Sequence, residues 1–575
     1  MFLKKISLPK ILLIAIVVLT SFLRLWNLNK VPVSLFGDEL DVGYQAYSVL
    51  KTGKDYSGNF LPFNFQSLAE WRTPLYLYSS VPTVAIFGIT PWGVRLPAAI
   101  FGILGVVAFY LLIKEVTKNE WWGLTGAFFL GISPWHIQYS RAGFEVTELL
   151  FFLIIGLFFF FKALKNQGKY LWLSGAFLVL TPWIYSTAKL FTPLLLVFLF
   201  LAFRKEILSF SKKKLVLTII VMAVLGLPVA YSTLFGGGTQ RFGYISVFTD
   251  PTVAPEIGVA RLRDSNMRGD NTLGVKPTIF DRAFHNKIVS WSEIIATNYL
   301  KSFSADFLFV KGDPNPRHSL GFGEFYRIDA LLLVLGLIFF VTKFENKKIK
   351  ALILFWILVA PLPASITRDG GNHATRLILM LPPLIFLSSY GLVKTFELLR
   401  KIPGKIFLVG YLSILLISFL FYQHQYWVHY PWDSERWWHA GFKETFEAMR
   451  EVEKNYDRVF ISMSGEPIWI FFAGWNQFPP EEWHEGYPFA GTYVEGFGQL
   501  SYIDKYYFGT ANEHGATIYD LSRYITSKDL YIAVAKENPW NLITEPEKIA
   551  PGLKLIKAIP YPSGEPAFYL FTSNK

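Results

Sequence analysis

The 575-residue sequence contains no cysteine, which excludes disulfide bonds and thiolate metal sites. Charged residues are scarce too: they make up 17% of the chain, against 52% hydrophobic and 18% aromatic residues. A soluble domain has a larger charged and a smaller apolar share. The sequence also lacks the Gly-x-x-x-x-Gly-Lys-Ser/Thr and His-Glu-x-x-His motifs, so nothing in it favours an ATP-driven pump or a zinc protease.

Long apolar runs dominate the first three quarters of the chain. A helix needs about 20 apolar residues to cross a bilayer. On this basis we predict a polytopic α-helical membrane protein with about eleven transmembrane helices. The predicted spans are 9–27, 96–113, 121–134, 146–161, 170–184, 190–203, 215–232, 328–342, 351–366, 376–393 and 406–422.

The net charge of +12 is distributed in a way that predicts orientation rather than nucleic-acid binding. Residues 423–575 hold 20 acidic and 13 basic residues, a balance of −7, so the remainder carries +19. Most of this excess lies in alternate short loops, from Lys4 and Lys5 before the first span to Arg400, Lys401 and Lys405 before the last. The positive-inside rule places these loops in the cytoplasm. We therefore predict a multi-pass protein of the cytoplasmic membrane, with the N-terminus inside and the C-terminal segment outside.

Three long segments are predicted to face outward. Residues 28–95 form the first outward loop, with a helix over 70–88 at the membrane interface, and residues 233–327 form a second. Residues 423–575 are long enough for a domain of their own. Their strand-like runs at 458–463 and 530–535 predict a small extracytoplasmic α/β domain following a transmembrane domain of residues 1–422.

The first candidate site is Phe36-Gly37-Asp38-Glu39, about ten residues after the first span. A carboxylate beside an apolar interface can serve as a general base for a hydroxyl or amine nucleophile. The alternative is that Asp38 only caps a helix beginning near Leu40.

The second candidate combines Arg95, at the start of the second span, with Arg141 and Glu145 in a short outward loop. Charge at the mouth of a span is costly unless it faces a polar cavity. Arg141 and Glu145 have the i, i+4 spacing of an ordinary ion pair on a helix, and Arg95 could instead extend to lipid headgroups.

Further candidates lie in later outward loops. Lys189 is the sole cation of its short loop, where the positive-inside rule does not favour it. In Thr367–Arg376, His373 and Arg376 could clamp a phosphate, unless the stretch is a polar turn. Arg317 and His318 could order the second long loop over a site, or belong to an ordinary turn.

The order of these motifs resembles that of the GT-C type membrane glycosyltransferases. The likeness is to the dolichyl-phosphate-mannose protein mannosyltransferases and to the lipid A aminoarabinose transferase, and it covers most of residues 9–400. The motifs that carry it are Phe36-Gly-Asp-Glu39, Thr90-Pro-Trp-Gly-Val-Arg95, Ser133-Pro-Trp-His-Ile-Gln-Tyr-Ser-Arg141 with Glu145, Thr181-Pro-Trp-Ile-Tyr-Ser-Thr187, and His373-Ala-Thr-Arg376 before Leu381-Pro-Pro383.

The resemblance implies that a sugar moves from a polyprenyl-phosphate donor to an extracytoplasmic acceptor by inverting displacement. It makes Asp38 the base, Glu39 a residue that orients the acceptor or neighbouring cations, and Glu145 a third acid of the site. It also implies that cations hold the departing phosphate. The candidates for this binding role are Arg95, Arg141, Lys189, Arg317, His318, His373 and Arg376.

The expected partners are the donor, an acceptor that is a protein, lipid or cell-wall glycan, and membrane lipids, with no nucleic acid. No cofactor is required, and no ligand spacing demands a metal, although the acids and histidines could hold a divalent cation. Two alternatives stay open. One is a ligase that moves an oligosaccharide or polymer from a lipid pyrophosphate, and the other is a transporter of lipid-linked sugars.

Overall fold

The computed structural model describes residues 7–68, 70–236, 240–269, 277–399, 401–463 and 465–575. Contacts divide the chain into two compact units, each composed of segments far apart in sequence. Unit 1 comprises residues 1–24, 101–139 and 145–422, and unit 2 comprises residues 25–100, 140–144 and 423–575. Lys4, Lys5 and Arg400, which entered the topology prediction, lie outside the described residues.

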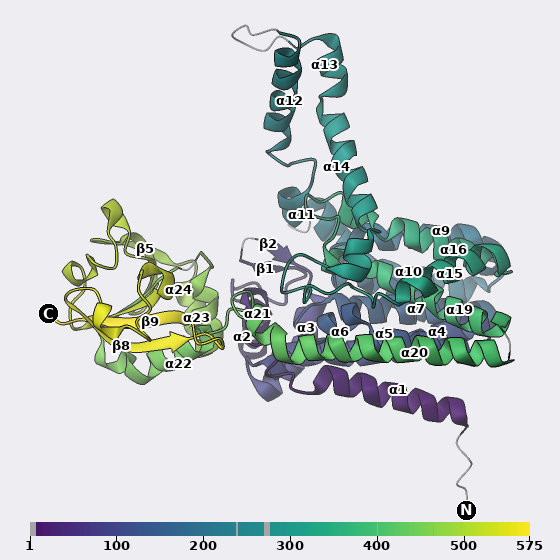
Figure 1. Cartoon of the computed structure of the whole chain (residues 1–575), viewed down its shortest axis with the longest axis horizontal. Helices are drawn as coiled ribbons and strands as arrows, with labels where there is room; N and C mark the ends of the chain where they lie inside the picture. The colour runs from purple at the N-terminus through teal and green to yellow at the C-terminus, as the bar shows by residue number, and fades with distance from the viewer. Residues whose placement is uncertain (1–6, 69, 237–239, 270–276, 400, 464) are drawn as a thin grey trace, which may run out of the picture. The chain divides into compact units, whose positions relative to one another are not determined.

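Unit 1 is helical, and Figure 1 shows its long helices packed side by side. Its helices, some of which continue into unit 2, are α1 (Leu8–Leu25), α4 (Pro91–Thr117), α5 (Glu120–Ile132), α6 (Pro134–Ser140), α7 (Val146–Lys165), α8 (Leu171–Leu180), α9 (Ala188–Leu208), α10 (Lys212–Phe235), α15 (Asp329–Lys343), α16 (Lys347–Val359), α17 (Leu362–Ser365), α18 (Ala374–Leu377), α19 (Leu381–Leu399) and α20 (Lys401–His424).

Every predicted span overlaps one of these helices, but fewer of them are long enough to cross a bilayer. Among the described residues, seven helical stretches have the required length and apolarity, so the count of eleven is not confirmed. Helices α5, α8 and α15 have 13, 10 and 15 residues and fall short. The seven stretches are Leu8–Leu25, Pro91–Thr117, Val146–Lys165, Lys212–Phe235, Lys347–Ser365, Ala374–Leu399 and Ile402–Asp433.

Helices α15 and α19 approach each other closely because both present glycine at the contact. A Cβ at Gly336 would lie 2.0 Å from the Leu387 carbonyl oxygen, and one at Gly391 would lie 2.3 Å from the Leu332 carbonyl oxygen. Small residues of this kind let helix backbones come together where no hydrophobic force acts between helices in lipid.

The predicted second outward loop is mostly helical. It contains α11 (Gln240–Ile245), α12 (Val253–Met267), α13 (Ile279–Phe284) and α14 (Lys287–Lys301). Helices α12 and α14 run side by side as the teal hairpin in Figure 1. A bidentate ion pair between Arg268 and Asp281 and the contact of His285 with Asp264 at 2.6 Å hold the hairpin together.

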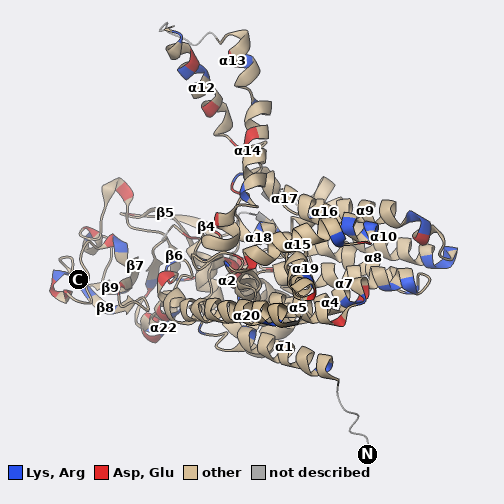
Figure 2. Ribbon diagram, turned by 45° about the vertical axis from the view of Figure 1, so that its right-hand side comes forward, with Lys and Arg blue, Asp and Glu red and all other residues tan. Residues whose placement is uncertain are grey.

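Basic residues gather at one end of helices α8, α9 and α10 of unit 1, as the blue segments in Figure 2 show. They include Arg204, Lys205 and the run Lys212–Lys214. These named residues lie at the end of α9 and the start of α10, on either side of a connection that the positive-inside rule predicts to be cytoplasmic.

Unit 2 begins with α2 (Gly37–Thr52), a ribbon of β1 (Phe65–Ser67) and β2 (Glu70–Arg72), and α3 (Leu75–Phe87). The prediction of one helix over 70–88 is wrong at its start, because 70–72 pair as an antiparallel strand with 65–67. The aromatic residues Phe65 and Trp71 of the two paired segments suit strands.

The C-terminal part of unit 2 confirms the predicted α/β architecture. Its sheet has the order β4-β5-β6-β3-β7-β9-β8, and β3 runs parallel to both β6 and β7. The strands are β3 (Arg458–Ile461), β4 (Ala490–Val494), β5 (Gly498–Ile503), β6 (Tyr506–Phe508), β7 (Asp529–Val534), β8 (Leu553–Pro560) and β9 (Pro566–Ser573), and the helices are α21 (Tyr430–Asp433), α22 (Phe442–Val452), α23 (Ile468–Asn476) and α24 (Pro480–Gly486).

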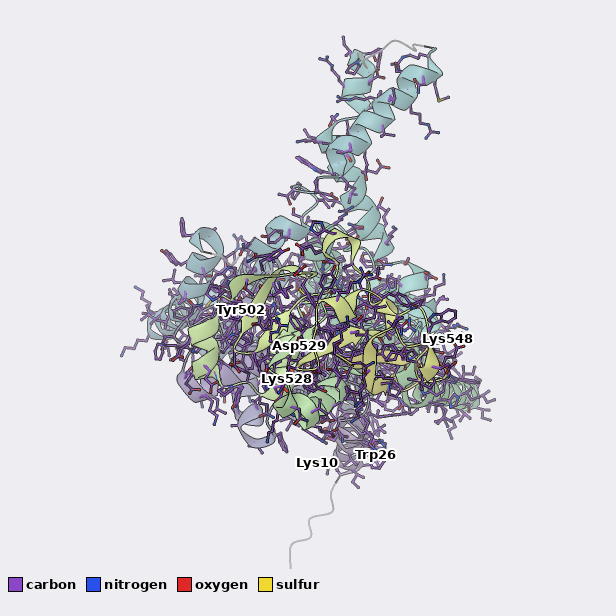
Figure 3. The ribbon with its side chains drawn as sticks, turned by 90° about the vertical axis from the view of Figure 1, so that its left-hand side faces the viewer. Lys10, Trp26, Tyr502, Lys528, Asp529 and Lys548 are labelled. Carbon is purple, nitrogen blue, oxygen red and sulfur yellow. The ribbon has the colours of Figure 1, made fainter. Side chains whose placement is uncertain are left out.

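An ion pair ties the two central strands of this sheet together at their beginnings. Asp529, labelled in Figure 3, starts β7 and accepts two hydrogen bonds from the Arg458 guanidinium of β3, at 2.7 and 2.8 Å. Burial opposes ionisation of Asp529, but the bond and the positive charge of Arg458 hold its pKa below the usual range.

Alternate side chains of β3 and β7 enter two cores, one on each face of the sheet. The first core contains Val459 and Ile461, and it also contains Leu40 and Tyr44 of α2. The second contains Phe460 and residues of the connections after β6 and β7. Helix α2 therefore packs on the C-terminal sheet domain as part of the same hydrophobic core.

Candidate functional site

The first turn of α2 carries the acids that the sequence singles out. Phe36 is the N-cap residue with an extended backbone, and Asp38 and Glu39 lie in the first turn. The alternative in which Asp38 caps the helix is therefore wrong, since the helix begins at Gly37. Acidic side chains in a first turn are stabilised by the helix dipole.

Aromatic packing fixes this end of α2. The Phe36 ring is buried and lies 5.5 Å from the Phe144 ring and 5.2 Å from the Trp438 ring, centroid to centroid. The second contact is edge-to-face, a geometry that aromatic pairs favour. Phe36, two residues before the candidate base, is thus held by contacts from two distant segments of unit 2.

Glu39 forms a buried ion pair with Arg95 of α4. Both side chains are fully buried, and the Arg95 Nε and Nη2 groups donate to the two carboxylate oxygens at 2.7 and 2.8 Å. The remaining guanidinium N–H groups donate to backbone carbonyls of the loop before α2. Those acceptors are Leu28, Pro32 and Ser34.

All five N–H groups of Arg95 are used by protein acceptors, and its guanidinium also lies 5.4 Å from the Trp438 ring centroid. Arg95 thus has no donor left for a lipid phosphate, and it does not extend to the headgroups. Its geometry instead supports the predicted role of Glu39 in orienting a neighbouring cation.

The segment 140–144 reaches this ion pair through its backbone. The Gly143 N–H donates to Glu39 Oε1 at 2.7 Å. A Cβ on Gly143 would lie 2.9 Å from Val94 Cγ1 and 3.1 Å from Glu39 Cγ, so a larger residue would push the carboxylate out of place. The loop that contains the predicted Arg141 therefore helps to position the first acid pair.

Arg141 is also fully buried. Its Nη2 group donates to the Val31 carbonyl at 2.8 Å, and its Nε group donates to the Tyr426 hydroxyl at 3.2 Å. The guanidinium lies 4.5 Å from the Trp427 ring centroid, within cation–π range. These contacts join the segment 140–144 to both the first loop and the start of the C-terminal part of unit 2.

Asp38 shares a cation with a third acid that sequence reasoning missed. The Arg72 Nη2 group lies 2.8 Å from Asp38 Oδ1, and its Nη1 group lies 3.6 Å from Asp41 Oδ2. Ser67 of β1 donates to Asp41 Oδ2 at 2.7 Å. The spacing of Asp38 and Asp41, i and i+3, places both on one helix face and could have revealed the pair.

The three acids of α2 differ sharply in exposure. The Asp38 side chain is 47% exposed, whereas those of Glu39 and Asp41 are 0% exposed. Burial raises the pKa of Asp41 to about 6, against the opposing effect of the nearby Arg72 charge. Asp38 is thus the acid of this helix turn that a solvent-borne hydroxyl can reach.

A second cluster lies in unit 1 and combines two predicted histidines with Asp313. Asp313 Oδ2 lies 2.9 Å from His318 Nδ1 and 3.8 Å from His373 Nδ1, and it accepts the Ala374 N–H at 2.7 Å. One ligand atom from each of the three side chains lies within 4.8 Å of the others. Asp313 was missed because it lies in a turn of irregular sequence.

Electrostatics favour an ionised Asp313. Its burial would raise the pKa, but the hydrogen bond and charge of His318 and the charge of His373 hold it below its usual range. Burial and the Asp313 charge raise the pKa of the nearby Glu324 well above its usual range. Asp313 therefore loses its proton more readily than an ordinary carboxyl group, and the nearby Glu324 holds its proton more tightly.

The remaining predicted residues of unit 1 are distributed around this cluster and elsewhere. The Arg317 carbonyl accepts a hydrogen bond from Gln138 at 2.6 Å. Arg376 donates to the Thr367 hydroxyl at 2.7 Å. Lys189 lies in the first turn of α9, and Glu145 is the N-cap residue of α7 without a side-chain cap bond.

The structure thus brings Asp38, Glu39, Arg95 and Arg141 together in unit 2, and Arg317, His318 and His373 together in unit 1. The Asn315–His318 stretch is an ordered turn, in which Asp313 and Asn315 side chains accept the backbone N–H groups of Asn315 and Arg317 at 2.8 and 2.9 Å. It is therefore both a turn and a part of the histidine cluster.

Part of the chain is similar to a family of known proteins. The sequence profile of the family described as dolichyl-phosphate-mannose-protein mannosyltransferase matches residues 72–231. This confirms the resemblance predicted from the sequence over a segment that includes Arg72, Arg95, Arg141, Glu145 and Lys189. Together with the long apolar helices, the match shows a multi-pass helical membrane protein.

Two curated relatives share part of the chain. YkcB of Bacillus subtilis, provisionally named a mannosyltransferase, is 27% identical over 221 residues, which is 37% of this chain and 29% of the relative. The dolichyl-phosphooligosaccharide-protein glycotransferase 2 of Pyrococcus furiosus is 32% identical over 111 residues, which is 19% of this chain and 14% of the relative. The chain thus matches less than a third of the length of either relative.

Among solved structures, ArnT from Cupriavidus metallidurans bound to undecaprenyl phosphate superposes with a TM-score of 0.49 at 11% identity, covering 98% of this chain and 97% of that one. The apo oligosaccharyltransferase of Archaeoglobus fulgidus gives a TM-score of 0.49 at 14% identity, covering 82% of this chain and 64% of that one.

Proposed function

We propose that this chain is a membrane glycosyltransferase that moves a sugar from a polyprenyl-phosphate donor to an acceptor outside the cytoplasm. The match to the mannosyltransferase family over residues 72–231 and the names of the two curated relatives support the reaction class. The observation that carries the proposal is the first turn of α2, where Asp38 is half-exposed and its two acidic neighbours are buried.

In the proposed reaction Asp38 takes the proton of the acceptor hydroxyl as the oxygen attacks the anomeric carbon. The new carbon–oxygen bond forms as the bond from that carbon to the phosphate oxygen breaks, and the polyprenyl phosphate leaves with the electron pair. Attack opposite to the leaving group inverts the anomeric configuration. The donor itself supplies the activation energy, so the step needs no nucleotide.

Within unit 2 the other charged residues position Asp38 rather than touch substrate. The Glu39–Arg95 pair fixes the start of α2 and the loop before it, and Gly143 and Arg141 extend this network. Arg72 holds the Asp38 carboxylate at 2.8 Å and shares its charge with the buried Asp41. A catalytic group held by locked neighbours keeps its reactive geometry.

For the departing phosphate we assign Lys189, His373 and Arg376, with Arg317 and His318 as supporting residues. Cations at the leaving oxygen lower the barrier by stabilising the charge that develops there. Arg95 and Arg141 are left out of this set because the protein uses their guanidinium groups internally. Glu145 is assigned to the site as its third acid, as the resemblance implies.

The cluster of Asp313, His318 and His373 is the proposed place for a divalent cation. One carboxylate and two imidazoles are a donor set that suits Zn²⁺, with a position left for water or a phosphate oxygen. The proposed displacement does not need the ion, and a structural role in ordering the turn after Gly312 is sufficient to explain the cluster.

The proposed location is the cytoplasmic membrane, with the N-terminus in the cytoplasm and residues 423–575 outside it. The clustering of basic residues near α8, α9 and α10 supports this orientation. The domain boundary proposed after residue 422 agrees with the point at which the chain leaves unit 1. The residues from 423 onward share unit 2 with the first outward loop.

The experiment uses the full-length protein in lipid nanodiscs with radiolabelled polyprenyl-phosphate sugars and a crude envelope fraction as acceptor. Wild type is compared with Asp38→Asn and with Asp504→Asn, the same chemical change at an exposed acid of the C-terminal sheet. We expect transfer in wild type and in Asp504→Asn, and at least a hundredfold loss in Asp38→Asn.

Transfer that survives in Asp38→Asn would show that the base is assigned wrongly. Two further arms address the alternatives. Transfer from a polyprenyl-pyrophosphate glycan alone would favour the ligase, and movement of labelled lipid across a liposome membrane without transfer would favour the transporter.

A further inference from the structure

A cavity of about 490 Å³ lies in the C-terminal part of unit 2 and contains none of the residues discussed so far. Its wall is formed by the segment 534–541 after β7, by Glu466 in the connection after β3, and by residues between β8 and β9. The cavity therefore lies at the carboxyl ends of two neighbouring parallel strands. Open α/β sheets bind their ligands at this end, and the volume suits a small molecule.

Two buried polar side chains in the cavity wall each have one atom without a protein partner. Asn538 is 6% exposed and His439 is 7% exposed. The Asn538 side-chain oxygen accepts the backbone N–H of Trp540 at 3.4 Å, but its Nδ2 group has no hydrogen-bond partner among the described residues. His439 Nε2 lies 3.2 Å from Glu466 Oε1, whereas His439 Nδ1 has no partner in the described part of the chain.

These two atoms offer complementary hydrogen bonds. The contact with the Glu466 carboxylate places the imidazole proton on Nε2, so Nδ1 is an acceptor, while Asn538 Nδ2 is a donor. Leaving a buried polar group without a partner is unfavourable. His439 also has φ = 51°, a strained backbone for a residue other than glycine, which occurs at functional sites. The wall is therefore built to receive a ligand that both accepts and donates.

Aromatic and charged residues complete the wall. Trp540 is 43% exposed. The Lys548 ammonium group lies 3.7 Å from the centroid of the Trp540 ring, but Lys548 does not line the cavity. Figure 3 labels Lys548 on unit 2. The Arg436 guanidinium stacks on the Tyr561 ring at 5.5 Å. The lining contains the cations Arg436 and Lys536 and the anions Glu466 and Glu565. Because the two cations and the two anions balance in charge, the lining does not favour a charged ligand.

We propose that this cavity is a carbohydrate-binding site for a neutral pyranose residue. Each sugar hydroxyl donates and accepts at once, which matches the pairing of Asn538 Nδ2 with His439 Nδ1. The apolar face of a pyranose ring suits the aromatic surface of Trp540 and Tyr561. The proposal uses residues of the C-terminal sheet part of unit 2 alone and does not depend on Asp38 or on the transfer reaction.

The test is saturation-transfer difference NMR on the full-length protein in nanodiscs, with methyl α-glucopyranoside, methyl α-mannopyranoside and glucuronate as probes. We expect saturable signal from at least one neutral glycoside. Asn538→Leu and Trp540→Ala should each raise its dissociation constant at least tenfold. Tyr519→Ala is the matched control, because Tyr519 has the same 43% exposure and does not line the cavity.

The variants must keep the wild-type melting temperature within a few degrees. His439→Asn is a further test of the cavity, because Asn tolerates the positive φ at this position. Absence of saturable binding by both neutral glycosides, or binding of glucuronate alone, would overturn the proposal. Equal binding by wild type and both cavity variants would overturn it too. Asp38→Asn should bind the glycoside as wild type does, so failure of the proposed transfer reaction leaves this result unaffected.

Discussion

The buried Glu39–Arg95 pair gives the sharpest quantitative prediction. Glu39→Gln keeps the shape of the side chain but leaves the Arg95 charge fully buried without its counter-ion. Removing one partner of a buried pair costs about 3–5 kcal/mol. Arg95→Met should lower the free energy of unfolding by at least as much. It leaves the buried Glu39 carboxylate and the carbonyls of Leu28, Pro32 and Ser34 without their hydrogen-bond donor.

The double variant should cost less than the sum of the two single variants by about 2–3 kcal/mol, since neither buried charge then remains. The assay is unfolding by SDS titration in mixed micelles, with the four proteins compared at equal lipid content. If the destabilisation of the double variant equals the sum of the two single destabilisations to within about 0.5 kcal/mol, the claim that the two residues form one structural unit is refuted. If the folded double variant keeps its affinity for polyprenyl phosphate, this supports the assignment that Arg95 does not bind the phosphate.

Three further predictions address other parts of the molecule. Because burial raises the pKa of Asp41 from 3.8 to about 6, its contribution to stability is full below the lower value and is lost as pH rises through the higher one. Relative to wild type, Asp41→Asn should thus gain up to about 3 kcal/mol between pH 4 and pH 8 in melting experiments; a pH-independent difference would contradict this. Gly143→Ala should destabilise the protein by about 1–3 kcal/mol, because its Cβ would lie 2.9 Å from a methyl group of Val94. An unchanged melting temperature would show that the loop shifts to accommodate the methyl group without loss of stability. Zn²⁺ should raise the melting temperature of wild type but not of His318→Ala; the same shift in both would place the metal elsewhere.

Much of the fold could be predicted because it depends on periodic, local signals. Apolar runs located the apolar helices of unit 1, although not α12 and α14 in the second outward loop. The strands at 458–461 and 529–534 were foreseen from their buried character. The number of membrane crossings was harder to predict. Helices such as α8, with ten residues, are apolar enough to be read as spans but too short to be counted as such.

The residues proposed for the site were named from the sequence, but their contacts were not. The motif around Asp38 and Glu39 pointed to the first turn of α2. Arg72 carried no signal of its own, and the i, i+3 spacing of Asp38 and Asp41 was passed over. Their roles depend on a short β-ribbon, which a helical interpretation of residues 70–88 had hidden. Arg95 was assigned to a ligand because sequence shows its charge, while the five acceptors that surround it come from distant parts of the chain.

The packing of α2 on α23 has a consequence for biogenesis. A Cβ on Gly474 of α23 would lie 2.8 Å from Leu40 Cδ2 of α2, so the fit between the two helices leaves no room for a side chain. More than 400 residues separate the partners, and a ribosome makes the second one last. In the proposed topology, the helix that bears Asp38 would therefore wait at the membrane surface without this part of its core until the C-terminal segment has been exported. Under the proposed function, transfer activity should then appear only after that segment has crossed the membrane.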